Sequence, residues 1–585
     1  MFREIICKIY SVKAVIDKAV KISKSLGIPL YSFNSEDYIY LNDPDNGYNN
    51  PDLVDQFVEY MKEEKGLDVS VVYDTSDTNE SIYNDLLSGR ATYDLVNASD
   101  YMVQKFVREG LVVPIDRNLI PNYVDYVSTE IGERLDRIEV NMDDGTKVSL
   151  ADYAIGYMWG TLGLLINPTY NAFPTGVDPL NDLATFEGLW DTRYKGTMTI
   201  KDSMRDTVAV AVMHMYKDTI EELADLYNSG EIDSDTYNSE LSYLFNIISY
   251  AEDNDVDETL SAIKDSLNSL KGNIFGMEVD SGKQDMVTGK IGINLAWSGD
   301  AVYSMDQAED ERGIELYYSL PITGSNIWFD AWSMPKNDKR SDAQYEVACE
   351  FLNFISDPYN ASQNMDYTGY TPFIAGDSIL DMARDWYDAR TDLIYYYDEE
   401  NDYYYDLYYV DPLTEEELSV WYEDCHFDYE SDELYDEVEL YYYDSNEEVV
   451  PYGLYNEDLL IDEEWSIVDL SYFFNGTLDE YEDDVDTIFY AEYYKEDNGA
   501  VGRQFYCQYP DEESVIRCCV MDDYGSRNTK VLRIWESFKS NPLPTWAVVL
   551  IIVEVVLIGG LIIFFVQRNY IKKRIRLKRL ANKEK

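Results

Sequence analysis

The strongest constraint on the fold is an alternation of short apolar runs with amphipathic helical patterns along residues 28–380. Short apolar runs bounded by polar turns predict strands, and they lie at 70–73, 93–97, 162–166, 197–200 and 291–296. Apolar residues spaced by three and four predict helices, at 52–65, 81–88, 99–109 and 341–355. Because strands that alternate with helices favour parallel sheets covered on both faces, the expected class is α/β.

A different composition begins at Thr391. Residues 391–494 contain no Lys or Arg, but they contain 35 Asp or Glu and 21 Tyr. Aromatic runs on either side of polar turns, at 394–405 and 439–455, are typical of β-hairpins. We therefore expect residues 391–499 to form an inserted acidic, Tyr-rich and β-rich module, with an acidic disordered tether as the alternative.

The C-terminal part of the chain contains an apolar stretch, residues 546–566, interrupted by a single charge at Glu554. A helix of 21 residues is long enough to cross a hydrocarbon layer of ~30 Å. Residues 567–585 carry nine basic side chains against one acid, which by the positive-inside rule places this tail in the cytoplasm. The sequence thus predicts a single-pass protein of the cell membrane. Residues 1–544, with 37 basic and 111 acidic side chains, are then extracellular or periplasmic.

The N-terminal segment 1–27 contains six basic residues and no uninterrupted apolar region. It therefore does not have the pattern of a secretory signal peptide. Export is then expected to depend on a different start of the chain, on an upstream membrane segment, or on the C-terminal span itself.

Charge and motifs exclude several classes of function. The net charge of −67 repels phosphate and makes nucleic acid a poor partner. Two histidines, and six cysteines with no C-x-x-C pair, do not form a metal-site pattern. The G-x-S-x-G, H-E-x-x-H and P-loop motifs are absent from the sequence. We expect no enzyme activity, no catalytic residue, no metal and no cofactor, and we interpret the cysteines as free buried thiols.

A series of motifs occurs in a distinctive order along residues 28–380. They are YSFNSEDYI at 31–39, YDLVNASDY at 93–101, YAIGYMWG at 153–160, DSMRD at 202–206, LAWSGDA at 295–301, WFD at 328–330 and GYTP at 369–372. In this order they resemble the extracellular solute-binding proteins of ABC importers, with a type 2 periplasmic-binding fold, and most closely the spermidine/putrescine-binding proteins. The acidic block and the C-terminal span have no counterpart in the usual family pattern.

The resemblance implies a bilobal α/β fold in which the ligand cleft lies between two lobes that close about a hinge. On this basis lobe 1 comprises residues 28–150 with part of 329–373. Lobe 2 comprises residues 151–328 with parts of 374–390 and 500–540.

The resemblance also implies a set of ligand-binding positions, one from each matching motif position. They are Ser35, Asp37, Tyr38, Ser99, Tyr101, Ser203, Asp206, Trp297, Trp328, Asp330 and Tyr370. Ser35 stands where an aromatic residue often stacks in the family, and Ser203 replaces a frequent aspartate. The alternative interpretation is that the tryptophans belong to the core and that Asp330 is a turn residue.

The chemistry of these residue types suits a polyamine, an aliphatic chain carrying several ammonium groups. Carboxylates form charge-assisted hydrogen bonds to ammonium groups, and aromatic faces attract cations and cover methylenes. The expected function is capture of spermidine or putrescine outside the cell and delivery to an ABC permease that a cytoplasmic ATPase drives. The alternatives are a surface adhesion or cation-binding protein that uses the acidic module, and a receptor for another small cation.

Overall fold

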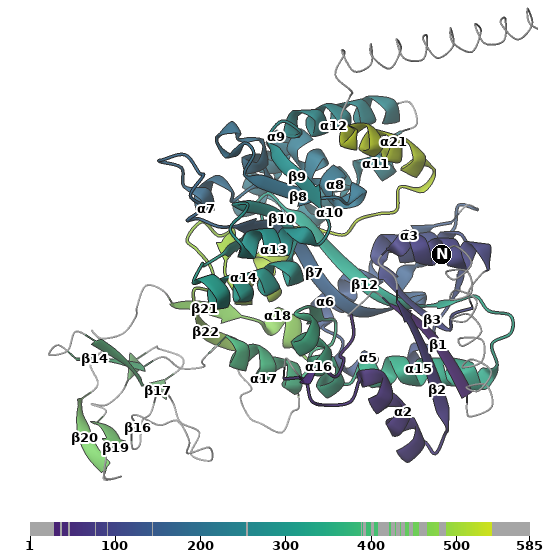
Figure 1. Cartoon of the computed structure of the whole chain (residues 1–585), viewed down its shortest axis with the longest axis horizontal. Coiled ribbons are helices and arrows are strands. Elements are labelled where there is room, and N and C mark those ends of the chain that lie inside the picture. The colour runs from purple at the N-terminus through teal and green to yellow at the C-terminus, as the bar shows by residue number, and fades with distance from the viewer. Residues whose placement is uncertain are drawn as a thin grey trace, which may run out of the picture. The chain divides into compact units, whose positions relative to one another are not determined.

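The computed structural model describes most of the chain (Figure 1). The described residues are 28–34, 38–44, 47–75, 78–89, 92–142, 144–252, 255–387, 389, 465–478 and 487–540, together with the backbone of short strands between 394 and 454. The chain divides into two compact units, Met1–Thr529 and Lys530–Lys585.

One end of the main sheet consists of three parallel strands. They are β1 (Ile28–Asn34), β2 (Val69–Thr75) and β3 (Leu95–Ser99), in the order β2-β1-β3. The connecting helices are α2 (Leu53–Glu63) and α3 (Asn79–Ser88), and α4 (Asp100–Arg108) follows β3 directly. Thr78 caps the start of α3 by accepting a hydrogen bond from the Ser81 amide, and Gly89, in the left-handed conformation, ends it. This β-α-β alternation confirms the predicted α/β class.

The other end of the sheet repeats the alternation. Strands β8 (Met198–Lys201), β9 (Ile274–Glu278) and β10 (Ile293–Trp297) are parallel to one another, with β8 in the centre. Helix α8 (Met204–Met215) follows β8, α12 (Val256–Leu270) precedes β9, and α14 (Ser298–Arg312) follows β10. The carboxyl ends of β8 and β10 therefore lie just before the first turns of α8 and α14.

Two long strands connect the two ends of the sheet. They are β7 (Ala154–Ile166) and β12 (Ser325–Pro335), and they pair antiparallel with each other. The C-terminal part of β12 also pairs with β3, and the C-terminal part of β7 with β10, both antiparallel. The sheet order is β2-β1-β3-β12-β7-β10-β8-β9 (Figure 1). The sheet is therefore mixed rather than parallel throughout, because these two strands run against their neighbours.

The remaining elements of residues 28–390 are helices and short strands, and three of these strands pair with strands of the main sheet. The helices are α5 (Pro121–Tyr126), α6 (Thr129–Asp136), α7 (Pro179–Asp182), α9 (Lys217–Asn228), α10 (Ser234–Phe245), α11 (Ile247–Tyr250), α13 (Ser281–Val287), α15 (Asp342–Ile355), α16 (Pro358–Thr368) and α17 (Asp377–Trp386). The 3-10 helices are η2 (Arg117–Leu119), η3 (Leu150–Asp152), η4 (Phe186–Trp190) and η5 (Thr192–Tyr194). The short strands are β4 (Val112–Val113), β5 (Glu139–Asn141), β6 (Lys147–Ser149), β11 (Tyr317–Ser319) and β13 (Thr371–Pro372).

Short strands occur in the acidic segment. β14 (Ile394–Asp398) pairs antiparallel with β15 (Tyr403–Leu407), and β19 (Glu439–Tyr443) pairs antiparallel with β20 (Val449–Leu454). These two pairs coincide with the two hairpins that the aromatic runs predict. The others are β16 (Trp421–Tyr422), β17 (Phe427–Asp428) and β18 (Glu433–Leu434). That residues 391–499 form one module stays a prediction.

The last part of that segment contributes to the core of the protein. β21 (Trp465–Asp469), α18 (Ser471–Phe474) and β22 (Ile488–Glu492) place Phe473 and Phe474 fully inside it. The Phe473 ring stacks on that of Trp159 in β7, with centroids 6.0 Å apart. The predicted module boundary at residue 499 therefore takes in core residues, because the acidic composition of the segment conceals this short apolar helix.

The chain then returns to the sheet. β23 (Val501–Gly502) pairs with β11 and β24 (Cys518–Cys519) with β12. The helices of this part are α19 (Gln504–Gln508), α20 (Glu512–Ile516), η7 (Gly525–Arg527) and α21 (Asn528–Lys539). Cys349, Cys507, Cys518 and Cys519 are free and buried, as the sequence predicts.

The predicted membrane segment is not part of the described structure. Over the residues that the structure describes, every helix is too short or too polar to span a bilayer. The apolar stretch 546–566, the basic tail 567–585 and the N-terminal segment 1–27 all lie outside the described residues.

Candidate ligand-binding site

Asp330 lies in the middle of β12, between the two ends of the sheet. The pairing of β12 with β7 shifts register between Asp330 and Ala331. The Tyr38 hydroxyl donates a hydrogen bond to Asp330 Oδ2 at 2.9 Å, and Ser99 is also hydrogen-bonded to this carboxylate. Burial raises the pKa of Asp330, and these two hydrogen bonds oppose that effect only in part. Asp330 is therefore a half-buried acid whose two hydrogen-bond donors in this contact are neutral.

An aromatic wall adjoins this acid. Tyr370 makes edge-to-face contacts with Tyr38 at 5.5 Å and with Trp328 at 5.6 Å between ring centroids. Such pairs prefer this geometry because the positive edge of one ring meets the negative face of the other. The Tyr370 hydroxyl donates to Asp300 Oδ1 at 3.0 Å, and burial raises the pKa of Tyr370 so that the hydroxyl keeps its proton. The wall is thus held by packing and by one directed hydrogen bond.

Ser99 is the last residue of β3, and Tyr101 lies in the first turn of α4. The Asn79 side-chain amide donates to Ser99 Oγ and to the Tyr101 hydroxyl, both at 3.1 Å. The guanidinium of Arg205, from α8, lies 4.0 Å from the Tyr101 ring centroid and 4.3 Å from that of Tyr524. The chain's own cation therefore lies over the ring that the sequence predicts for a ligand.

Ser203 and Asp206 form the start of α8. Ser203 is the N-cap, and its Oγ accepts a hydrogen bond from the Asp206 amide at 3.4 Å. The Asp206 carboxylate is hydrogen-bonded to Ser203 and to Trp297, which ends β10. Burial raises the pKa of Asp206 above that of a free aspartic acid, while these bonds and Lys201 lower it in part. Asp206 is thus a second acid beside an aromatic ring, and it is buried.

Lys201, the last residue of β8, is only 1 % exposed. Its Nζ lies 3.0 Å from Asp300 Oδ2, 3.5 Å from Glu278 Oε1 and 4.1 Å from the Trp297 ring centroid. Burial lowers the pKa of Lys201, but the two carboxylates outweigh this and raise it overall. Burial alone would raise the pKa of Asp300, because it disfavours the charged carboxylate. Lys201 and Lys283 outweigh this effect and bring the pKa of Asp300 below its usual value. The pair is therefore charged.

The structure brings nine of the eleven predicted positions into one contact network. They are Tyr38, Ser99, Tyr101, Ser203, Asp206, Trp297, Trp328, Asp330 and Tyr370. The other two, Ser35 and Asp37, lie outside the described residues. That these residues bind a ligand stays a prediction.

Several members of the network are not among the predicted positions, chiefly Lys201, Arg205, Asp300 and Asn79. Arg205 lies within a matching motif, and Lys201 immediately precedes it. Asp300 lies in another matching motif. Their position in or beside a matching motif was the sequence signal that could have identified these residues. The sequence alone does not say which basic residues are buried.

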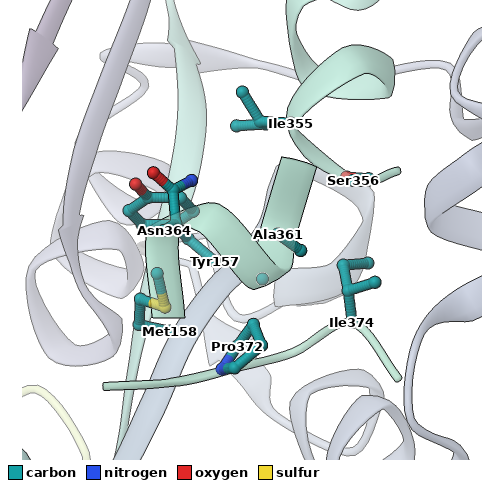
Figure 2. Close-up of a pocket in the computed structure, with 9 residues that line it drawn as sticks. Tyr157, Met158, Ile355, Ser356, Ala361, Asn364, Pro372 and Ile374 are labelled. Carbon is teal, nitrogen blue, oxygen red and sulfur yellow. The ribbon is translucent and has the colours of Figure 1, made fainter. Parts of the chain in front are cut away.

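A small cavity is lined by residues of β7, α15, α16 and β13 (Figure 2). Its volume of about 10 Å³ suffices for a single water molecule. Tyr157 and Asn364 line it, and they hold the segment that carries Tyr38: the Tyr157 hydroxyl donates to Tyr38 O at 2.7 Å, and the Tyr40 amide donates to Asn364 Oδ1 at 2.8 Å. This cavity contains none of the predicted ligand positions, so we assign it a packing role.

We expect Gly299→Ala to destabilise the protein by about 1–3 kcal/mol, the usual range for overpacking. A Cβ at Gly299, in the first turn of α14, would lie within 2.6 Å of Tyr370 Cζ and closer to other atoms of that ring. The ring must then shift, and its hydrogen bond to Asp300 is strained. Urea denaturation measures the effect. Gly276→Ala is the matched control, because nothing lies within 4 Å of a Cβ there. Equal stability of the two variants would contradict the expectation.

Comparison with known proteins assigns the family. The sequence pattern of the bacterial extracellular solute-binding proteins matches residues 55–380. The spermidine/putrescine-binding periplasmic protein of Escherichia coli (strain K12) is 22 % identical over 353 residues, which is 60 % of this chain and 79 % of that protein. The putrescine-binding periplasmic protein SpuD of Pseudomonas aeruginosa (strain UCBPP-PA14) is 24 % identical over 330 residues, 56 % of this chain and 74 % of that one.

Among solved structures, the spermidine/putrescine ABC transporter substrate-binding protein PotD from Streptococcus pneumoniae is similar over 59 % of this chain and 83 % of that one. Its sequence identity is 27 % and the TM-score is 0.40. The family match alone extends over more than half of the chain and contains β2, β3, β7, β8, β10 and β12. The resemblance that the motifs predict is confirmed, and the chain belongs to the family of bacterial extracellular solute-binding proteins.

Proposed function

We propose that this protein is the solute-binding component of an ABC importer and that its ligand is an amine of the putrescine and spermidine class. The names of its relatives support this choice. The single observation that carries it is the state of Asp206 and Asp330. Asp206 is buried and Asp330 half-buried, and each is hydrogen-bonded to an aromatic residue. In the described part of the chain neither has a Lys, Arg or His nitrogen within 4.0 Å, although Lys201 and Arg205 lower the pKa of Asp206 from farther away.

An ammonium group satisfies such an acid better than water or a hydroxyl does. The N–H donors of an alkylammonium form charge-assisted hydrogen bonds with a carboxylate, about twice as strong as neutral ones. The rings of Tyr38, Trp328 and Tyr370 offer cation-π contacts of about 0.5–2 kcal/mol each and an apolar surface for methylenes. The carboxylates recognise the charge of an aliphatic amine, and the rings recognise its hydrocarbon chain.

We further propose that the protein works at the outer face of a cell membrane. The family supports an extracellular or periplasmic binding domain. The apolar stretch 546–566 and the basic tail 567–585 support a single C-terminal span with its end in the cytoplasm. The partners that this arrangement requires are permease subunits in the same membrane and their cytoplasmic ATPase.

Calorimetry on the purified full chain in detergent tests the proposal. Putrescine, spermidine and spermine are titrated separately, and we expect saturable binding of at least one of them. An amine at 100 times its Kd should also stabilise the protein against urea by about 2.7 kcal/mol. No heat and no stabilisation with any of the three amines would refute the proposed ligand class.

A further inference from the structure

Residues 520–523, which follow β24, contact both ends of the main sheet. On one side they are bound by α4, which follows β3. On the other side they are bound by α8, which follows β8, and by Asn246, the residue that joins α10 to α11. Strands β7 and β12 connect the two ends within the sheet, so this segment is a further connection that lies outside it.

Helix α4 holds the segment through two side chains. Gln104 donates a hydrogen bond from Nε2 to Met521 O at 2.9 Å and accepts one from the Asp523 amide at 3.1 Å. This side-chain amide thus binds the segment as the peptide group of a neighbouring strand would. Arg108, the last residue of α4, forms an ion pair with the Asp523 carboxylate through Oδ2.

The other end of the sheet holds the same segment from the opposite side. Asn246 donates from Nδ2 to Val520 O at 2.9 Å and accepts from the Asp522 amide at 2.9 Å. Arg205, in the first turn of α8, donates to Asp522 O at 2.7 Å and to Asp523 Oδ1 at 3.3 Å. Alternate peptide groups of an extended chain point in opposite directions, so the two ends of the sheet bind alternate residues of one segment.

Asp523 is the residue at which the two sides meet. Its side chain is 5 % exposed, and its carboxylate pairs with Arg108 from α4 and with Arg205 from α8. Among the residues that the structure describes, no other carboxylate lies within 4.0 Å of a nitrogen of both arginines. Removing one partner of a buried ion pair leaves a charge without compensation, which is costly. The charge of Asp523 therefore couples the end of α4 to the start of α8.

These two helices carry four of the predicted ligand positions. Ser99 immediately precedes α4, and Tyr101 lies in its first turn. Ser203 is the N-cap of α8, and Asp206 lies in its first turn. Arg205 also faces the Tyr101 ring, with its guanidinium carbon 4.0 Å from the centroid. A change in the spacing of α4 and α8 would therefore separate one pair of predicted ligand positions from the other.

We propose that Asp523 is an ionic latch, which through Arg108 and Arg205 keeps α4 and α8 at the spacing that assembles the ligand-binding network. Asp523 is then a positioning residue, which acts on the ligand without being one of the predicted ligand positions. When the latch is broken, a smaller fraction of the ligand-free protein has the network assembled, and the apparent affinity falls by that fraction. The positioning role rests on the proposed amine-binding function, whereas the latch itself does not.

Hydrogen–deuterium exchange on the full chain in detergent, without any amine, tests the latch. Arg108→Met removes the charge and keeps an unbranched, flexible side chain. We expect the amides of residues 520–523 to exchange about tenfold faster than in the wild type, because local opening of this segment becomes easier. The Asp522 amide is the decisive one, since Asn246 binds it from the side opposite to Arg108.

Arg137→Met is the matched control for this experiment. Arg137 is 62 % exposed and pairs with Glu133 at 2.8 Å, so its replacement removes the same charge at the surface. Exchange of residues 520–523 should then stay within about twofold of the wild type. If Arg108→Met also leaves the exchange of the Asp522 amide within about twofold of the wild type, the latch is refuted.

Calorimetry on the full chain tests the positioning role, with whichever of putrescine, spermidine and spermine the wild type binds most tightly. Among the described residues, Arg108 pairs with Glu109 and Asp523 and with none of the predicted ligand positions. Arg108→Met should nevertheless weaken binding by about fivefold, and Asp523→Asn by at least as much. Adding Arg108→Met to Asp523→Asn should change the affinity by less than about twofold, because the latch is already broken.

Independent effects of the two substitutions, which multiply in the double variant, would overturn the positioning role and leave the proposed function in place. So would unchanged affinity in Arg108→Met. If Asp523→Asn does not fold, the exchange and the affinity of Arg108→Met decide the question. A wild-type protein that binds none of the three amines refutes the proposed function instead, and the exchange experiment still tests the latch.

Discussion

Replacing Asp330 by asparagine is expected to weaken putrescine binding by about 100-fold, or ~3 kcal/mol, as calorimetry on the full chain would measure. The asparagine keeps an oxygen that accepts the Tyr38 hydroxyl, which now lies 2.9 Å from the carboxylate, so the local packing is retained. What is lost is the negative charge. Since Asp330 is half-buried, a ligand ammonium facing a neutral amide is left without its compensating charge, which costs more than the same change at a fully exposed position.

The control for this variant is Asp310→Asn. Asp310 is exposed near the end of α14, and its replacement changes the net charge of the protein by the same amount. Long-range attraction between the acidic protein and a cation is then altered equally in both variants, while only Asp330→Asn changes the network. Affinity that is unchanged by Asp330→Asn, or reduced equally by Asp310→Asn, would move the binding site away from β12.

Asp100→Asn is expected to change how stability depends on pH. Asp100 is 2 % exposed, and its Oδ2 accepts a hydrogen bond from the Phe329 amide at 2.9 Å. Burial raises the pKa of Asp100 to about 8, with a smaller contribution from Asp330 in the same direction, while backbone amides and Arg205 oppose it. The folded protein therefore keeps a proton on Asp100 at pH values where the unfolded chain, with a pKa of about 3.9, has lost it.

The sign of the effect follows from proton linkage. Between about pH 4 and pH 8 the folded state binds one more proton at Asp100 than the unfolded state. This group therefore makes the free energy of unfolding fall by about 1.4 kcal/mol for each pH unit as the pH rises. Asparagine, which is neutral in both states, removes that dependence. Urea denaturation at pH 5, 6.5 and 8 should show the wild type losing stability relative to Asp100→Asn as the pH increases.

The exposed aspartate again supplies the comparison. Asp310→Asn should leave the slope of stability against pH as it is in the wild type. Parallel curves for the wild type and Asp100→Asn would mean that Asp100 is ionised in the folded protein, and the interpretation of this residue as a neutral acid would then be wrong.

Much of the secondary structure followed from local patterns. The predicted strand at 197–200 lies at β8 and the one at 291–296 at β10. The predicted helix at 341–355 coincides with α15, where Ser341 and Gln344 form a capping box. Periodicity and capping are properties of a few neighbouring residues, so they can be recognised without knowledge of the rest of the chain.

Strand pairing and core contacts between segments that are distant in the sequence were predicted less completely. Alternation of strands and helices favoured parallel sheets, but the long strands β7 and β12 are antiparallel to each other and connect the two ends of one mixed sheet. Likewise the acidic composition around residue 470 concealed Phe473 and Phe474, which are fully buried. Both features depend on which segments meet, and net composition carries little information about that.

The candidate site also has a part that the sequence predicted and a part that only the tertiary structure decided. The order of motifs along the chain was enough to identify the aromatic and acidic residues that meet around β12, and several of the motifs lie where a strand ends or a helix begins. The sequence has 46 lysines and arginines, and only the fold decides which of them lie beside these residues. The parallel pairing of β8 with β10 places Lys201 beside Trp297. The physical reason is that burial of a charge depends on partners brought from far along the chain, and Lys201 obtains its partners from β9 and α14.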